Sequence, residues 1–262
     1  MTSIVPRMWR QSYKNINPCS TRSKRTHSER IFVDSSGRKG FRYNDSVIKF
    51  GRNVNGWEAK TLRFIKQSTS IPVPDVIAEG PHALEMNYID GENLRDCWPQ
   101  FSDGEKQRIA EQMGRILAQL RGLKGSYIGA INRGPAEDNR RSSYRGGPFD
   151  SENDWNQFLL GNMIRQTPAL YRYALQQKFK TNHQVVFTHA DLGLRNILVK
   201  NGHIVGLLDW ESSGWYPEHW EYVKFCTAST SEPTYHKLGP VMFPTTYPDE
   251  LVTDTFYSRF VF

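Results

Sequence analysis

Polar side chains that can hold a metal ion or accept a proton are grouped late in the chain. His189, Asp191 and Asn196 follow one apolar run, and Asp209 ends a second run. Carboxylate and amide oxygens are suitable ligands for Mg²⁺, which takes one or two from the protein and the rest from phosphates and water. An aspartate within reach of a hydroxyl can also take its proton. The group is typical of a site that combines metal binding with proton abstraction.

A hairpin is expected to bring these groups together. The apolar runs 197–199 and 204–208 flank Asn201-Gly202, a strong signal for a tight turn between antiparallel strands. Asn196 and Asp209 then stand at the two bases of the hairpin, and Asp191 lies in the loop before it. A plainer interpretation makes these residues a turn, a cap and a strand end, but the hairpin context favours one site.

The segments before residue 91 are mostly strand-like. Short strands are expected within residues 31–50, and Asn44-Asp45 marks a turn between two of them. A helix is expected at 56–67 and must end before Ile71–Pro74, because proline removes a backbone donor. Two more strands follow, at about 75–79 and 83–89.

Helical patterns dominate after Gly91. Ser102 and Glu105 form a capping-box pattern, and apolar residues then recur at helical spacing up to Leu120. A long loop is expected at 125–150, and a helix at 155–177 that is interrupted near Pro168. The order predicts a two-lobed α+β fold. Its predicted parts are a basic, disordered tail (1–30), a β-rich N-lobe (31–86) and a hinge with a larger, mainly helical C-lobe (87–262).

Composition narrows the classes of protein. The chain has 262 residues and a net charge of +7, of which residues 1–30 carry +6. The rest is nearly neutral, so no nucleic-acid partner is expected, and no apolar run is long enough for a membrane span. The scattered Cys19, Cys97 and Cys226 predict a cytoplasmic protein without disulfides. We expect a monomer, and the basic tail leaves a mitochondrial transit peptide open as an alternative.

Residues 185–225 resemble the aminoglycoside phosphotransferase family, which includes choline-kinase-like enzymes and is related to protein kinases. Residues 214–224 are similar to its fungal-type branch. The resemblance continues upstream through Val47–Gly51, similar to the strand that carries the phosphate-binding lysine, and through 58–74. Met86–Gly91 is similar to the hinge, and Trp98-Pro99 to the residues that follow it.

The resemblance implies ATP- and Mg-dependent transfer of the γ-phosphate to a hydroxyl of a small molecule, which could be cationic. By position, Asp191 would be the catalytic base, and His189 would brace its loop by hydrogen bonds. The implied nucleotide and metal residues are Lys49 paired with Glu58, Met86 and Tyr88 at the hinge, and Asn196 and Asp209 on magnesium.

Some residues depart from the kinase pattern. Gly37 and Gly40 make only a weak phosphate-covering loop, and only 53 residues follow Asp209, counted as 262 − 209. These two observations keep a catalytically quiet, kinase-like binding module open as an alternative. Ala190 replaces the usual glycine and adds one methyl group, for which we expect room. Gly193 stands at the position of a lysine in protein kinases, and Trp210-Glu211 follows Asp209, which together argue against a protein kinase.

The segment after Asp209 leaves two questions open. Its aromatic residues could form a wall for a cationic acceptor or fill the core, and core packing is favoured because large aromatics mostly fill interiors. Its acidic residues could attract an amino group of the acceptor or cap helix ends. The residues concerned are Trp215, Tyr216 and Trp220, and Glu211, Glu218 and Glu221.

Overall fold

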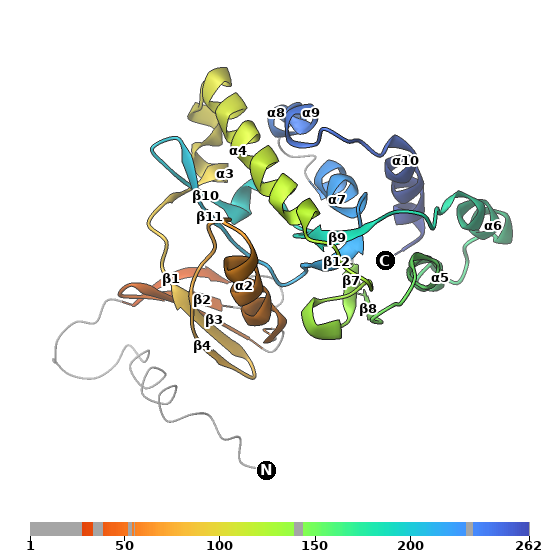
Figure 1. Cartoon of the computed structure of the whole chain (residues 1–262), viewed down its shortest axis with the longest axis horizontal. Helices are drawn as coiled ribbons and strands as arrows, with labels where there is room; N and C mark the ends of the chain where they lie inside the picture. The colour runs from red at the N-terminus through yellow and green to blue at the C-terminus, as the bar shows by residue number, and fades with distance from the viewer. Residues whose placement is uncertain are drawn as a thin grey trace, which may run out of the picture.

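The chain folds into a β-rich part and a mainly helical part, shown at the lower left and the right of Figure 1. The computed structural model describes residues 28–33, 39–51, 54, 56–138, 144–228 and 233–261. Most of the basic segment predicted as a tail lies outside the described residues, and so does Gly37.

The N-lobe is a five-stranded antiparallel sheet in the order β1-β2-β3-β5-β4. Its first strand begins at Ser28, inside the predicted tail, because backbone pairing with β2 extends it beyond the apolar residues. Asn44 adopts a positive φ of 52° in the predicted turn between β2 and β3. The strands are β1 (Ser28–Val33), β2 (Lys39–Tyr43), β3 (Ser46–Phe50), β4 (Val76–Gly80) and β5 (Ala83–Asn87).

One helix, α2 (Gly56–Ser68), lies beside this sheet (Figure 1). It buries Ala59, Leu62 and Ile65, which recur three residues apart and so form one apolar face. Glu58 is buried on the same helix although it is charged. A buried carboxylate requires a partner, and the partner proves to be part of the site.

Residues 88–91 connect the two lobes. They lead from β5 to β6 (Glu92–Asn93), which pairs with β10 in the sheet β11-β10-β6. A Cβ on Gly91 would lie 2.8 Å from Cγ2 of Val205 on β11, so only glycine fits this crossing without a shift.

The C-lobe is built around the long helix α4. Its capping box is present: the Ser102 hydroxyl accepts from the Glu105 N–H, and the Glu105 carboxylate accepts from the Ser102 N–H. The other helices are α3 (Leu94–Cys97), α4 (Asp103–Gly122), α5 (Glu152–Gly161), α6 (Ala169–Lys178), α7 (Trp220–Ala228), α8 (Pro233–His236), α9 (Gly239–Met242) and α10 (Pro248–Tyr257). The remaining strands are β7 (Ala136–Asp138), β8 (Tyr144–Gly146), β9 (Val185–Thr188), β10 (Ile197–Lys200), β11 (His203–Leu207) and β12 (Gly214–Pro217).

The segment predicted as a loop at 125–150 contains a small hairpin, in which β7 pairs with β8. The prediction was wrong here because strands of three residues are too short to show a side-chain alternation. Asp138 at the end of β7 is buried and its carboxylate lies 3.0 Å from the buried ammonium of Lys224 on α7. This ion pair ties the hairpin to the helix that follows the site.

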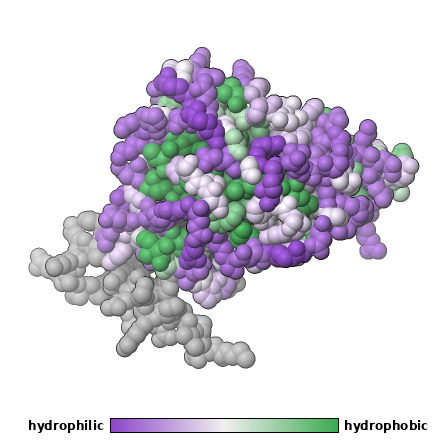
Figure 2. All heavy atoms as spheres, in the orientation of Figure 1, coloured by the Kyte–Doolittle hydropathy of each residue, from purple (hydrophilic) through white to green (hydrophobic). Residues whose placement is uncertain are grey.

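The aromatic residues after Asp209 belong to the core, as the sequence favoured. Tyr216 and Trp220 are 1% exposed and stack on each other, and Trp155 packs edge-on against both. Trp215 packs against Phe187 in a second cluster that continues from α4 to α2 and β5. No described helix is long and apolar enough to cross a membrane, and the face in Figure 2 is largely hydrophilic.

Candidate active site

Two neighbouring loops carry the predicted site. Residues 189–196 connect β9 to β10, and residues 208–213 connect β11 to β12. Both strand pairs are antiparallel, β9 with β12 and β10 with β11, so the two loops emerge side by side. The Leu208 N–H donates to the Asn196 carbonyl over 2.8 Å, which places Asn196 and Asp209 at the base of one hairpin, as predicted.

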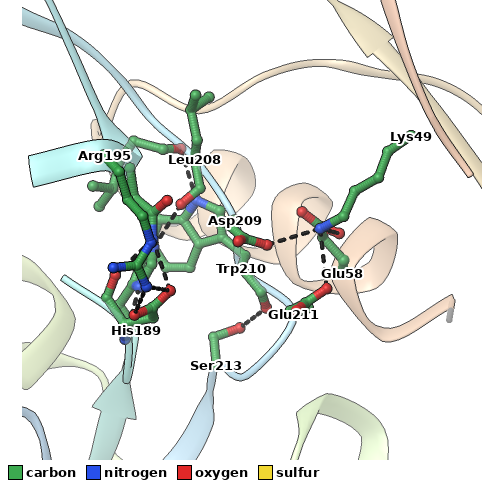
Figure 3. A network of polar contacts seen from close by, with 12 residues as sticks. Lys49, Glu58, His189, Arg195, Leu208, Asp209, Trp210, Glu211 and Ser213 are labelled. Atoms are coloured by element: carbon green, nitrogen blue, oxygen red, sulfur yellow. Dashed lines mark hydrogen bonds and ion pairs between the residues drawn. The ribbon is translucent and has the colours of Figure 1, made fainter. Parts of the chain in front are cut away.

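Lys49 on β3 lies among three carboxylates (Figure 3). Its Nζ is 2.8 Å from Glu58 Oε2, 2.8 Å from Asp209 Oδ1 and 3.0 Å from Glu211 Oε2. Burial opposes the charge on Lys49, but Glu58 and Asp209 outweigh it and raise its pKa. The ion pair with Glu58 matches the pairing that the resemblance implied. Glu211 was interpreted as a substrate contact or a helix cap, and neither role explains its contact with Lys49.

His189 is fully buried beneath the loop and forms bracing hydrogen bonds. Its Nε2 lies 3.0 Å from the Leu208 carbonyl, and its Nδ1 lies 3.2 Å from the Asp191 N–H. Nε2 therefore carries the proton and donates, while Nδ1 accepts. Burial lowers the pKa of His189 against the pull of Asp191, so the ring is neutral.

Glu221 on α7 holds the same loop from below. Its buried carboxylate accepts from the N–H groups of His189 at 2.5 Å and Ala190 at 3.1 Å. Burial raises the pKa of Glu221 to about 7, although these two hydrogen bonds act in the opposite direction. Glu221 therefore holds this loop in place, a role that neither interpretation from the sequence included.

Ala190 fits its space but adopts a backbone conformation that favours glycine. Its side chain is 3% exposed within the core, and its φ is +67°. An L-residue in this left-handed region costs about 1–2 kcal/mol. The extra methyl group therefore finds room, as expected, while the backbone carries the strain. The hydrogen bonds of Glu221 to this turn help to offset the backbone strain.

Asp191 is held by two donors that follow it in the loop. Arg195 Nη2 lies 2.5 Å and 2.7 Å from its two carboxylate oxygens, and Asn196 Nδ2 lies 2.9 Å from Oδ2. Arg195 was missed from the sequence, although its i,i+4 spacing from Asp191 was a signal. A Cβ on Gly193 would lie 3.0 Å from Arg195 Nη1, so glycine leaves room for the guanidinium.

The two predicted metal ligands differ in orientation. Asp209 has a side chain that is 31% exposed and an oxygen that lies within 4.8 Å of oxygens of Glu58 and Glu211. The Asn196 amide nitrogen donates to the Asp191 carbonyl at 2.8 Å and to its carboxylate. Hard oxygen ligands of this kind fit Mg²⁺. The negative charge that would attract the ion comes from Asp209 and from Glu211 beside it, because the amide of Asn196 is neutral.

The predicted hinge residues lie at the end of the N-lobe sheet. Met86 is buried in β5, opposite Val47, and its side chain packs in the core. Tyr88 follows β5, and its N–H donates to the Asp45 carbonyl over 2.8 Å. The Arg42 guanidinium covers the Tyr88 ring at 3.7 Å. A nucleotide contact by Met86 therefore has to come from its backbone or from a side-chain rearrangement.

The small antiparallel sheet, the helical second lobe and the lysine–glutamate pair facing an aspartate loop define a protein-kinase-like fold. The model of the phosphotransferase enzyme family matches residues 56–237, most of the chain, and the chain therefore belongs to that family.

Solved structures of aminoglycoside phosphotransferases share the fold. The streptomycin–ATP ternary complex of APH(2")-IIa is 13% identical with a TM-score of 0.63 and covers 98% of this chain and 87% of that one. ADP-bound APH(2'')-Ib is 13% identical with a TM-score of 0.62, covering 96% and 84%. An apo thermostable mutant of APH(4)-Ia is 12% identical with a TM-score of 0.64, covering 88% and 84%. No curated protein matches the chain.

Proposed function

We propose that this protein transfers the γ-phosphate of ATP to a hydroxyl group of a small molecule. The observation that carries the proposal is the contact between β3 and the loop at 208–213. Lys49 reaches Asp209 across 160 residues of sequence and also pairs with Glu58. Phosphoryl transfer depends mainly on positioning and on neutralising phosphate charge. This arrangement supplies an ammonium for the phosphates and a carboxylate for a metal ion.

In the proposed reaction, the acceptor oxygen bonds to the γ-phosphorus and the bond to the β–γ bridging oxygen breaks, releasing ADP. The hydroxyl proton passes to Asp191, whose carboxylate is oriented by Arg195 and Asn196. Lys49 exchanges part of its carboxylate contacts for phosphate oxygens. His189, being neutral and buried, keeps Asp191 in place through the backbone N–H.

Asp209 and Asn196 would hold Mg²⁺, which neutralises phosphate charge when bound. Asp209 and Glu211 bring two partly exposed carboxylates to one place, which is the donor chemistry that this ion prefers. Asn196 would have to present its amide oxygen. Its nitrogen already faces Asp191, so one rotamer of the amide can serve both partners.

We propose that the acceptor is cationic. The loops that would face it carry Asp191, Asp209 and Glu211, which give the site an excess of negative charge before the nucleotide binds. Among the structures that share the fold, one holds streptomycin and another gentamicin. Fold similarity at this level of identity does not set a substrate, so a panel of amino-alcohols, sugars and aminoglycosides should be screened for acceptor-dependent ADP release.

The test compares Asp191→Asn and Asp209→Asn with the wild-type chain, using an acceptor found in that panel. Each substitution should lower kcat by about 100-fold or more. Asp96→Asn is the matched control, because Asp96 is an exposed aspartate on α3 whose ion pair is with its neighbour Arg95 and not with a residue of either loop. Turnover at the wild-type rate in either site variant would contradict the proposal.

Nucleotide binding separates an enzyme from a quiet binding module. A thermal-shift titration with ATP and Mg²⁺ should stabilise both the wild-type chain and Asp191→Asn, since Asp191 does not contact the nucleotide in this mechanism. Stabilisation of the wild type without ADP release for any acceptor in the panel would support a quiet module. The absence of any shift at millimolar nucleotide would contradict ATP as the donor.

A further inference from the structure

A second group of metal-ligating side chains lies in the C-lobe, at the end of β9 opposite to His189. Glu152 is the first residue of α5, His183 precedes β9, and His219 stands between β12 and α7. Their side chains are 4%, 9% and 14% exposed, respectively. The proposed reaction gives none of them a role, so their convergence requires a separate explanation.

The three ligand atoms are arranged closely enough for one ion. One atom from each residue lies within 4.8 Å of the others. Glu152 Oε1 is 2.7 Å from His183 Nδ1 and 4.0 Å from His219 Nδ1. Two ligands of a tetrahedral Zn²⁺ are about 3.3 Å apart, given bonds of about 2.0–2.1 Å. On binding the ion, the distance from Glu152 to His183 must therefore lengthen and the distance from Glu152 to His219 must shorten, each by less than about 1 Å.

The surroundings of the ligands resemble those of protein zinc sites. The other ring nitrogen of His183, Nε2, lies 3.3 Å from Glu250 Oε1 on α10. Histidine ligands commonly donate their second N–H to a carboxylate, which fixes the ring and its tautomer. Glu152 is oriented as well, because its Oε2 accepts from the His183 N–H at 3.0 Å. Lys180 lies 2.6 Å from Glu250 and balances its charge.

We propose that Glu152, His183 and His219 bind a divalent transition-metal ion of the Zn²⁺ type, with a water molecule as its fourth ligand. The ion replaces the proton between His183 Nδ1 and Glu152, and the Glu250 carboxylate stays beside His183 Nε2 as its charge partner. Imidazole and carboxylate ligands suit zinc, whereas Mg²⁺ prefers oxygen ligands and keeps several waters. Bound there, the ion links α5, the segment before β9 and the start of α7. The proposal is independent of the phosphotransferase proposal.

The test uses the full chain without a histidine tag, stripped with EDTA, with millimolar Mg²⁺ present to occupy the oxygen ligands around Asp209. Zinc is then added, and the zinc that the chain retains after dialysis is measured by elemental analysis. Affinity is measured by competition with a chelating dye. We expect one retained equivalent. Glu152→Gln and His219→Gln should each weaken zinc binding by about 100-fold, and Glu250→Gln by about 10–100-fold. His203→Gln, on the exposed hairpin, is the matched control and should bind as the wild type does.

A second measurement needs no substitution. Acylation of histidines by diethyl pyrocarbonate, followed by mass spectrometry, should be slowed by zinc at His183 and His219 and unchanged at His203. Failure of the wild-type chain to retain zinc would overturn the proposal and leave a hydrogen-bonded histidine–glutamate cluster. Retention that survives both Glu152→Gln and His219→Gln would also overturn it, because the ion would then be bound elsewhere.

Discussion

The charges around Lys49 determine which ions the site can bind. One ammonium lies among the carboxylates of Glu58, Asp209 and Glu211, and Lys49 and Glu58 are buried. The formal charge of this group is −2, counted as three carboxylates against one ammonium. Burial of unbalanced charge is costly, so a divalent cation would relieve the cluster. The nucleotide phosphates would then be attracted by the ion and by Lys49 together.

Arg195 is the residue whose substitution should reveal how Asp191 is positioned. We expect Arg195→Met to lower kcat by about tenfold, with a smaller effect on KM for ATP. The guanidinium contacts both carboxylate oxygens, and a hydrogen bond to a charged group contributes about 1.5–3 kcal/mol. Half of the Arg195 side chain is exposed, so solvent screening places the effect at the lower end. Steady-state kinetics with both substrates measures it.

Arg95→Met is the matched control for this substitution. Arg95 is an exposed arginine on α3 whose guanidinium forms an ion pair with its neighbour Asp96. The control should leave kcat unchanged. An Arg195→Met variant with wild-type kcat, or one affected only in stability, would show that the guanidinium does not position the base.

The elements that carry the site differ in how far the sequence predicts them. The hairpin around Asn201-Gly202 and the capping box at Ser102 are local patterns, and both are present. Contacts between distant elements leave no such pattern. Glu221 on α7 binds the loop at 189–196, and Glu211 in the C-lobe reaches Lys49 in the N-lobe. Their identity as acidic residues was visible, but their partners depend on the tertiary fold.

A substitution in the turn of the hairpin should change the stability of the fold and leave activity unchanged. Gly202 has a φ of +75°, and a Cβ there would meet no atom within 4 Å. Gly202→Ala should therefore lower the free energy of unfolding by about 1 kcal/mol, purely through left-handed backbone strain. Activity should remain unchanged, because the turn lies at the opposite end of the hairpin from Asn196 and Asp209. Urea unfolding measures the first effect and steady-state kinetics the second.

A glycine-to-alanine substitution at Gly122 should change the free energy of unfolding in the opposite direction. Gly122 ends α4, also has open space around its Cβ position and does not have a positive φ. Gly122→Ala should therefore stabilise the fold by about 0.4–1 kcal/mol, by restricting the unfolded chain. Equal effects of the two substitutions would show that backbone conformation does not decide the outcome.

At the scale of the whole molecule, a hydrophobic cluster and an ion-pair network are among the contacts that join the two lobes. The cluster runs from Leu62 and Leu84 in the N-lobe to Leu117 and Phe187 in the C-lobe. The network runs from β3 through Lys49 to the loop after β11. The general architecture was predictable because strand-like and helical segments are separated along the chain. The contacts between the lobes were not, because they join residues far apart in sequence.

Glu221 should make the stability of the whole fold depend on pH. The pKa of Glu221 is about 7 in the folded protein, against 4.5 for a glutamate exposed to water, as in the unfolded chain. Burial is the main cause of this difference. Between these values the folded state holds a proton that the unfolded state has lost. The stabilisation is therefore complete below about pH 4.5 and is lost as pH rises through about 7. The difference corresponds to about 3 kcal/mol as an order of magnitude.

Comparison with Glu221→Gln isolates this contribution from other titrating groups. His183 also has a raised pKa, because its hydrogen bond to Glu152 and the neighbouring carboxylates outweigh burial, and it shifts stability in the same direction. That effect is common to both proteins and cancels in their difference. Between about pH 5 and pH 8 the wild-type chain should lose about 1–3 kcal/mol of unfolding free energy relative to the variant. Parallel pH profiles in urea unfolding would mean that Glu221 titrates alike in the folded and unfolded chains, and that its hydrogen bonds to His189 and Ala190 fully compensate its burial.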